Sequence, residues 1–295
     1  MGDADNSAAI KESRRMLRQV QRHLSQSLID LGASRENIGL VDVVYHPKNK
    51  LPHINYVSPR KNTAWIPAPE IKKGLERLRE LERKPRIIYI EGLYPPLFAK
   101  SIRDLGLVIE QESTIMVYNI DERRRKEINN FTPPTEMQTE EVSNEDGSAL
   151  WWYIWRNVNY DVLTKGIEPL YVGKSVSEIA LGHQVDLLLY MYGFPIAVAR
   201  LTIHDDTAHI AALAIIKESH TPEIELLLHK AALKAAADRK CTLVFVSGEG
   251  ETARSRNRKV GFVDCGSTVR YVEDTDEPDE VDNGKSTDKS VFVLR

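Results

Sequence analysis

The most informative stretch of the sequence is residues 209–238, which read HIAALAIIKESHTPEIELLLHKAALKAAAD. The apolar run from His209 to Ile216 predicts a strand. A short polar break follows, and the proline at position 222 suits the first turn of a helix. The alanines that come next predict close packing of a helix that continues to about Asp238. The stretch therefore predicts a strand followed by a long helix.

Apolar spacing predicts further elements on both sides of this stretch. In the second half, strands are expected at 185–192, 196–204, 242–247, 262–272 and 290–294, and helices at 150–163, 175–181 and 251–259. In the first half, helices are expected at 16–31, 71–81 and 96–104, and strands at 38–45, 53–57, 86–91, 107–111 and 114–120. Residues 122–149 have almost no apolar content and are expected to be a linker. The patterns predict two domains, 1–121 and 150–295.

The two halves repeat the same order of landmarks. Pro69-Glu70-Ile71 opens a predicted helix in the first half, and Pro222-Glu223-Ile224 opens one in the second. A predicted strand follows each helix. A glycine with an apolar pair comes later in each half, as Gly106-Leu107-Val108 and Gly261-Phe262-Val263. Because these landmarks occur in the same order and at nearly the same spacing in both halves, they indicate a duplication.

The second half resembles the GNAT acyltransferase superfamily in two short motifs. Leu213-Ala214-Ile215 is similar to the Leu-Ala-Val of the family's central strand. The family's closing motif has Ala, Lys, Gly and Phe where this sequence has Ala253, Lys259, Gly261 and Phe262. The first half is similar to the degenerate N-terminal copy of tandem members. The resemblance implies an α/β (α+β) fold of two GNAT-like domains in tandem, each a mixed, mostly antiparallel sheet flanked by helices, with the second as the more plausible catalytic copy.

This resemblance implies transfer of an acyl group from an acyl-CoA to an amine by direct attack. In the family, the central strand and the strand after the long helix separate, and the pantetheine arm lies between them. The implied co-substrate is acetyl-CoA or another acyl-CoA, and the implied acceptor is a small-molecule or protein amine. Glu218 or His220 would take the amine proton. The implied acyl-CoA contacts are Ala214, Ile215 and Ile216 on the strand, Thr221 at the turn into the helix, Arg254 on the short helix, and Asn257, which stands where many members have a tyrosine.

The turn that would hold the diphosphate departs from the family pattern. Glutamates stand at both of its glycine positions, as Glu223 and Glu225, and Pro222 lacks an amide hydrogen. A like-charge pair ~4 Å apart costs on the order of 4 kcal/mol at an effective dielectric near 20. Two interpretations stay open: Thr221 caps the helix and the glutamates complement its dipole, or the ligand is displaced towards basic residues such as Arg256. The alternative function is a non-catalytic GNAT-fold protein that serves as a binding scaffold.

Two clusters suggest other chemistry and have ordinary structural explanations. His204, Asp205, Asp206 and His209 could hold a metal, but they lie between two predicted strands, where a hairpin turn is expected and a metal is not. Trp151, Trp152 and Trp155 could form an aromatic cage, or they could pack a helix onto the sheet. We expect a turn at the first cluster and core packing at the second.

The 295-residue chain has 42% hydrophobic and 28% charged residues and a net charge of −3, which is typical of a soluble globular protein. That balance excludes a strongly basic nucleic-acid binder, and glutamates flank the only basic run, 123–126. Residues 273–289 are strongly acidic and predict a solvated loop. No apolar run is long enough for a membrane span and no signal peptide is recognised. The two cysteines are expected to be free thiols in the cytoplasm, and no pattern specifies the oligomeric state.

Overall fold

The computed structural model describes residues 2–60, 66–161, 166–248 and 250–274. Contacts divide the chain into two compact units. Unit 1 contains the residues up to Ile115, together with 247–251 and the segment that begins at Asp264, and unit 2 contains Met116–Val246 and Thr252–Val263. The strand predicted at 290–294 and most of the acidic loop lie outside the described residues.

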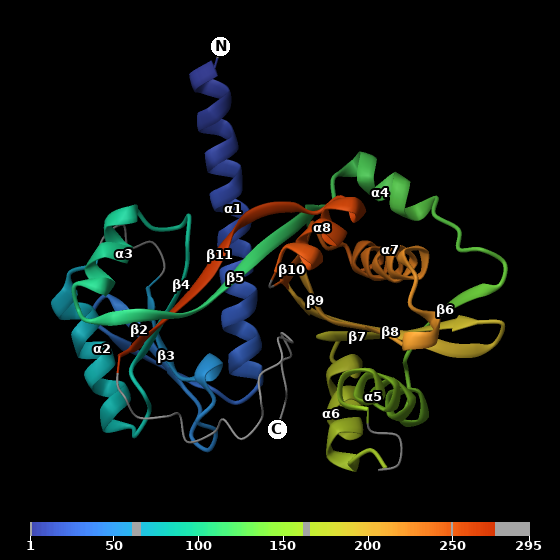
Figure 1. Cartoon of the computed structure of the whole chain (residues 1–295), viewed down its shortest axis with the longest axis horizontal. Helices are drawn as coiled ribbons and strands as arrows, with labels where there is room; N and C mark the ends of the chain where they lie inside the picture. Colours follow the sequence, from blue (N-terminus) through green and yellow to red (C-terminus); the bar gives the residue numbers. More distant parts are fainter. Residues whose placement is uncertain (1, 61–65, 162–165, 249, 275–295) are drawn as a thin grey trace. The chain divides into compact units, whose positions relative to one another are not determined.

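Unit 1 is built on a mixed sheet between helices. Its strands lie in the order β1 (Ser34–Ile38), β2 (Val41–Tyr45), β3 (Tyr56–Pro59), β4 (Arg86–Ile90), β11 (Val263–Glu273) and β5 (Leu107–Asn119). The helices are α1 (Gly2–Asp30), η1 (Pro52–Ile54), α2 (Ala68–Glu80) and α3 (Pro96–Arg103) (Figure 1). One face of the sheet packs with α2 and α3 through residues such as Val43 and Val57. Alternate residues, such as Val44 and Tyr56, pack on the other face with Leu28 of α1.

Unit 2 is also a sheet between helices. Its strands lie in the order β5, β10 (Leu243–Gly248), β9 (Thr207–Ile215), β8 (Phe194–His204), β7 (Gln184–Met191) and β6 (Met137–Glu141). The pairs from β6 to β9 are antiparallel, and β9 pairs with β10 in parallel. Helix α7 (Pro222–Asp238) covers one face, and α5 (Glu145–Tyr160) and α6 (Pro169–Ala180) cover the other (Figure 1). The remaining helices are α4 (Glu122–Asn129), η2 (Lys217–Ser219) and α8 (Glu251–Val260).

The strand and helix predicted from residues 209–238 are confirmed as β9 and α7. The buried side of α7 carries three leucines, Leu227, Leu228 and Leu233, and a stripe of alanines that includes Ala232 and Ala236. Small alanine side chains let the helix lie close to the sheet, and each fully buried leucine contributes roughly 1.5–3 kcal/mol. The aromatic cluster in α5 is core packing as well, because Trp151, which is 1% exposed, lies on the sheet with its neighbouring tryptophans.

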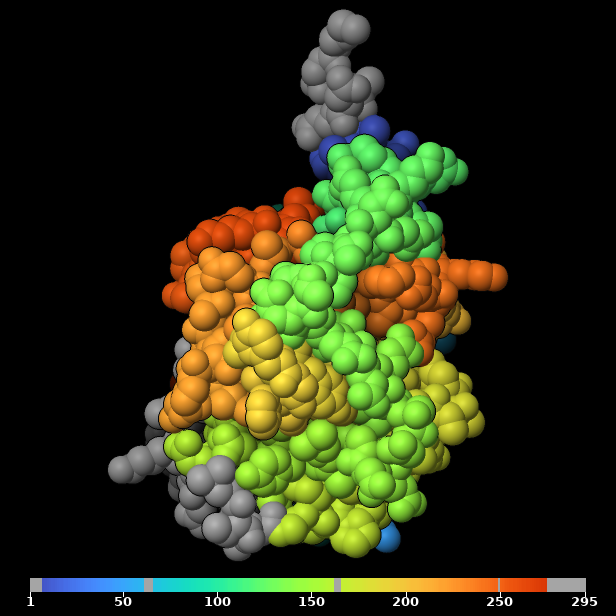
Figure 2. Space-filling model, turned by 90° about the vertical axis from the view of Figure 1, so that its right-hand side faces the viewer, coloured from blue at the N-terminus to red at the C-terminus, as the bar shows by residue number. Residues whose placement is uncertain are grey.

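The segment 122–149 has more regular structure than its composition predicts, since it contains α4 and β6. Long-range contacts explain the difference. Ile128 of α4 is buried in the unit 2 core, and the Arg125 guanidinium donates hydrogen bonds to the carbonyl of Ala237 in the last turn of α7 and to that of Cys241 just after the helix. Figure 2 shows this green segment lying as a continuous band against the orange surface of unit 2. The segment is therefore not an unstructured linker.

Strand β11 joins the sheet of unit 1. It pairs with β4 in antiparallel register, from Thr268 opposite Ile90 to Val272 opposite Arg86. The predicted division into 1–121 and 150–295 places this strand in the second half of the chain. The sequence pattern predicts that the strand exists, but it does not predict which sheet the strand joins.

No described helix combines the length and apolar character needed to cross a bilayer.

Candidate functional site

The two parallel strands at the centre of unit 2 separate after three residue pairs. Their register runs from Leu243 opposite Thr207 to Phe245 opposite His209. Strand β9 continues for six more residues to Ile215, and no residue of β10 pairs with them. This fork leaves one edge of β9 without a neighbouring strand over residues 210–215. Such an edge can pair with the amide groups of an extended ligand.

A bulge in β9 lies beside the fork. Leu201 of β8 is opposite Ile210, whereas the preceding residue, Arg200, is opposite Ala212, so Ala211 is the extra residue. A bulge increases the local twist of a strand and often marks a functional site. It also reverses the alternation of side chains, because Ile210 and Ile215 both pack towards α7 although they are an odd number of positions apart. The bulge therefore redirects β9 where it parts from β10.

The backbone amides of two residues are directed to the open edge of β9. The amide of Ile216 donates to the carbonyl of Ile196, at the end of β8, with 2.9 Å between nitrogen and oxygen. Because successive residues of an antiparallel strand hydrogen-bond to opposite sides, the amides of Leu213 and Ile215 face the fork. Of the three strand residues predicted to contact a ligand, Ile215 has this placement, whereas the amides of Ala214 and Ile216 serve the pairing with β8. The sequence pattern did not single out the Leu213 amide.

The N-terminus of α7 adjoins the open end of β9. Thr221 is the N-cap, and its side-chain oxygen accepts a hydrogen bond from the amide of Ile224 at 3.3 Å. Pro222 occupies the first turn of α7, and the acidic residue Glu223 lies in the same turn. Hydrogen bonds from its own amide and from the Thr221 hydroxyl lower the pKa of the Glu223 carboxyl. This arrangement satisfies the helix end with the chain's own groups and does not fit a diphosphate at that position.

Glu225, the second acidic residue of this turn, is held by basic side chains. Its carboxylate lies 3.2 Å from Nε of Arg256 on α8 and 3.9 Å from Nε2 of His220. The Glu225 side chain is 17% exposed, whereas those of Arg256 and His220 are 44% and 47% exposed. The predicted basic region is therefore present next to the α7 N-terminus, with one of its arginines already paired to an acid.

Helix α8 is fixed to α7 by a buried pair. His229 of α7 is 1% exposed, and its Nδ1 lies 2.9 Å from the Glu225 carbonyl, so Nδ1 carries the proton. Its Nε2 lies 3.2 Å from Oδ1 of Asn257. Burial is the main cause that lowers the pKa of His229, whereas the contacts with the Glu225 carbonyl and with Asn257 favour the protonated ring. Asn257 is thus a structural contact between helices, and it does not offer the phenol of the tyrosine that many family members have at this position.

The end of α8 requires a glycine. Gly261 has φ 109°, a conformation that L side chains rarely adopt. A side chain there would also meet the ring of Tyr118 at 3.2 Å. The Tyr118 ring in turn packs against Phe262, with ring centroids 5.5 Å apart. The glycine and phenylalanine of the closing motif therefore have packing roles.

A buried ion pair lies beside the bulge. Arg200 on β8 and Asp186 on β7 are directly opposite each other and form two hydrogen bonds of 2.7 Å. Asp186 is fully buried and Arg200 is 7% exposed. The guanidinium carbon lies 3.9 Å from the centre of the Trp151 ring, and Ser175 of α6 accepts a further hydrogen bond at 3.0 Å. The network fixes α5 and α6 to the strand that pairs with the bulge.

The remaining predicted residues lie on η2, on α8 or in a turn. Glu218 is exposed in η2, which connects β9 to α7, and Arg254 is half-buried on α8. Asp205 adopts φ 52° in the predicted hairpin turn, and the Asp206 carboxylate accepts a hydrogen bond from the Thr242 hydroxyl at 2.7 Å. Among the described residues, no three His, Cys, Asp or Glu side chains form a group able to hold a metal.

Comparisons with known proteins identify the fold. No protein-family model matches the sequence, and no curated protein matches it. A GCN5-related N-acetyltransferase from Kribbella flavida superposes with a TM-score of 0.64 at 15% identity, covering 86% of this chain and 94% of that one. A GCN5-related N-acetyltransferase from Sphaerobacter thermophilus gives 0.54 at 11% identity, covering 80% and 81%. A tandem GNAT protein from the clavulanic acid biosynthesis pathway gives 0.54 at 11% identity, covering 78% and 77%.

These similarities extend over most of the chain, and at such identities they concern its fold. The chain therefore has the fold of the GNAT N-acetyltransferases, as its short motifs and its repeated order of elements predict.

Proposed function

We propose that unit 2 is an acyl-CoA-dependent N-acyltransferase that passes an acyl group to an amine. The observation that carries the proposal is the end of β9–β10 pairing at His209 and Phe245. The open edge presents the amides of Leu213 and Ile215, and the pantetheine arm of an acyl-CoA carries amide groups that can pair with such an edge. A strand that is paired along its whole length could not take this ligand.

The reaction is acyl transfer from a thioester sulfur to an amine nitrogen. The nitrogen attacks the carbonyl carbon, the carbon–sulfur bond breaks, and the thiol leaves. The amide of Ile215 is suited to polarise the thioester carbonyl. Glu218 or His220 takes the amine proton, directly or through one water, because both are exposed on the segment after β9. The Glu225 carboxylate, 3.9 Å from His220, helps to orient the imidazole.

The diphosphate of the acyl-CoA takes a displaced position in this proposal. The N-terminus of α7 is capped by Thr221 and carries Glu223 and Glu225, so the anion is directed to the basic residues of α8. Arg254 and Arg256 lie on that helix, and Arg256 already reaches the turn through Glu225. We expect weaker binding than a glycine-rich turn gives, since one arginine must be shared between the ligand and an acid.

The capped helix also favours a second function, a GNAT-fold scaffold without catalysis. Thr221 and the two glutamates satisfy the end of α7 without any ligand. Asn257, bonded to His229, is no proton donor for a leaving thiol. In this case the chain would bind a partner through its fold and would not turn over an acyl-CoA.

Titration of the full chain with acetyl-CoA, followed by a thiol-release assay with a panel of amines, separates the two functions. The acyltransferase predicts saturable binding and thiol release that depends on the amine. Replacing the correct base, in Glu218→Gln or His220→Gln, is expected to lower kcat by roughly 100-fold with little change in KM. Binding without thiol release, or no binding at millimolar ligand, would leave only the scaffold.

A matched pair of variants tests the open edge. Leu213→Pro removes the amide that faces the fork, whereas Leu213→Ala removes most of the same side chain and keeps the amide. Acetyl-CoA affinity is expected to fall at least tenfold further in the proline variant than in the alanine variant. Proline removes the hydrogen bond to the ligand, and its ring also blocks the edge of β9, so the two losses of binding free energy add up. Equal effects of the two substitutions would argue against pantetheine pairing with β9.

A further inference from the structure

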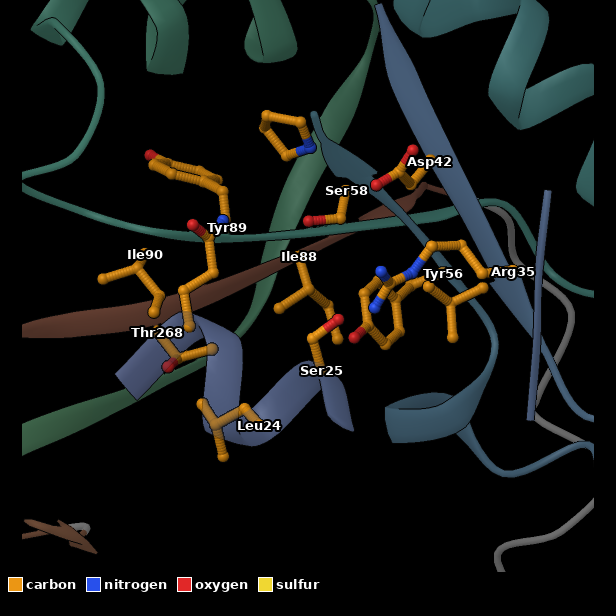
Figure 3. Close-up of a pocket in the computed structure, with 13 residues that line it drawn as sticks. Leu24, Ser25, Arg35, Asp42, Tyr56, Ser58, Ile88, Tyr89, Ile90 and Thr268 are labelled. Carbon is orange, nitrogen blue, oxygen red and sulfur yellow. The ribbon is translucent and has the colours of Figure 1, made fainter. Parts of the chain in front are cut away.

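Unit 1 contains a fork and a small cavity of its own. Its parallel strands β3 and β4 share a single residue pair, Val57 opposite Ile87. A cavity of about 60 Å³ lies between the α1-facing side of these strands and α1 itself. Figure 3 shows Ser58 and Tyr56 from β3, Ile88 and Ile90 from β4, and Leu24 and Ser25 from α1 around this space.

The cavity wall carries hydroxyl groups that bond to no other described residue. Tyr56 is 8% exposed, and its hydroxyl makes no hydrogen bond within the described part of the chain. Ser25 and Ser58 are partly exposed, and their hydroxyls likewise have no partner among the described residues. Burial is the main cause that raises the pKa of the Tyr56 hydroxyl, and this favours its protonated form. None of these hydroxyl oxygens is a fully buried atom without a partner, so they are accessible and can bond to a polar occupant of the cavity.

The wall also carries both signs of charge. Asp42 on β2 is directly opposite Ser58, and its carboxylate lies 3.6 Å from Nε of Arg60. Arg35 on β1 is opposite Val44, two residues from Asp42, and it forms no ion pair with a described carboxylate. Residues at such diagonal positions lie roughly 7–8 Å apart, and their Cβ atoms are somewhat closer. A small molecule between the two heads could face Asp42 with a cation and Arg35 with an anion.

We propose that this cavity binds a small zwitterionic amino acid. Its ammonium group lies against Asp42 and the Ser58 hydroxyl, and its carboxylate accepts from Arg35 and the Tyr56 hydroxyl. A volume of 60 Å³ corresponds to about four to six water positions, which limits the ligand to about the size of glycine or alanine. The site is separate from the fork of unit 2, and it does not depend on acyl transfer there.

Saturation-transfer NMR on the full chain tests the proposal, with alanine, ethylamine and propionate as probes. We expect saturable transfer to alanine, with a dissociation constant in the millimolar range, and at least tenfold weaker binding of the two singly charged probes. Two substitutions of charged residues that line the cavity, Arg35→Gln and Asp42→Asn, should each weaken alanine binding at least tenfold. Asp104→Asn, an exposed carboxylate at the end of α3, is the matched control and should leave binding unchanged.

Three results would overturn the site: no transfer to alanine, equal binding of alanine and ethylamine, or alanine binding that survives Arg35→Gln. Circular dichroism of each variant establishes that the fold is retained. Arg35 is exposed, so its variant keeps the test decisive if Asp42→Asn destabilises unit 1. Acetyl-CoA titrations of the same variants should match the wild type, since none of these residues belongs to unit 2.

Discussion

The imidazole of His209 lies flat against the ring of Phe245, with centroids 4.4 Å apart and planes 8° from parallel. These two residues are also the last cross-strand pair before β9 and β10 separate. The His209 residue is 5% exposed, and burial lowers its pKa to about 4. A neutral, stacked histidine thus closes the base of the fork in unit 2.

The stability of the chain should depend on pH through this histidine. Its pKa is about 4 in the folded state and near 6.5 when unfolded, so the unfolded state binds more protons between those values. The free energy of unfolding therefore falls as the pH decreases from about 6.5 to about 4, by roughly 3 kcal/mol for one such group. Urea denaturation at several pH values measures the effect.

Other histidines contribute to the same pH range. Burial is the chief cause that lowers the pKa of His53 in unit 1 to about 4, and it also lowers the pKa of His229. His209→Phe keeps an aromatic ring on Phe245 and should remove only part of the pH dependence. His183→Gln, at an imidazole that is 45% exposed, should leave it unchanged. An unaltered slope in His209→Phe would show that His209 does not titrate as described.

The N-cap of α7 should contribute measurably to stability. Thr221→Ala removes the oxygen that accepts from the Ile224 amide, and such losses cost about 1 kcal/mol. Thr221→Ser keeps the oxygen and should lie within a few tenths of a kcal/mol of the wild type. Chemical denaturation of the two variants gives the comparison, and equal stability would mean that the cap bond contributes nothing.

The buried ion pair beside the bulge should be far more important than a surface pair. Arg200→Met leaves the carboxylate of Asp186 buried without its cation, which typically costs about 3–5 kcal/mol. Arg239→Met breaks the exposed pair between Arg239 and Glu141 and should cost at most about 1 kcal/mol. Thermal and urea unfolding of both variants measures the contrast, and similar losses in the two would contradict the assigned role of Arg200.

Removing one acid from the α7 turn should strengthen acyl-CoA binding. Glu225→Gln removes a negative charge from the turn and releases Arg256, which lies 3.2 Å from that carboxylate. The Glu225 side chain is partly buried but Arg256 is exposed, so screening by solvent limits the effect to roughly 1 kcal/mol, which is a five- to tenfold gain in affinity. Isothermal titration with acetyl-CoA measures it, with Glu168→Gln at the start of α6 as the control. Unchanged or weaker binding would place the diphosphate elsewhere.

The sequence was most informative where local spacing determines structure. The apolar run before residue 216 and the proline and alanines of 222–238 define β9 and α7 because both elements follow from local patterns. The turn at Asp205 could be predicted for the same reason. Thr221 as a cap also follows from its position before Pro222, since a hydroxyl residue there suits a helix start.

The remaining features depend on which distant residues meet. The fork arises because β10 stops pairing at Phe245, and nothing in either strand's own composition marks that point. Arg200 and Asp186 are neighbours only through the register of two strands, and His229 reaches Asn257 only through the packing of two helices. The cavity of unit 1 likewise requires α1 to cover alternate residues of strands that are far away in the sequence.

The open edge of β9 is tested most directly by amide NMR of the full chain, labelled with ¹⁵N-leucine and ¹⁵N-isoleucine and titrated with acetyl-CoA. Our account predicts saturable shifts of the Leu213 and Ile215 amides, with little change at Ile216, whose amide donates to β8. Saturating acetyl-CoA that leaves the Leu213 and Ile215 signals in place would contradict the account.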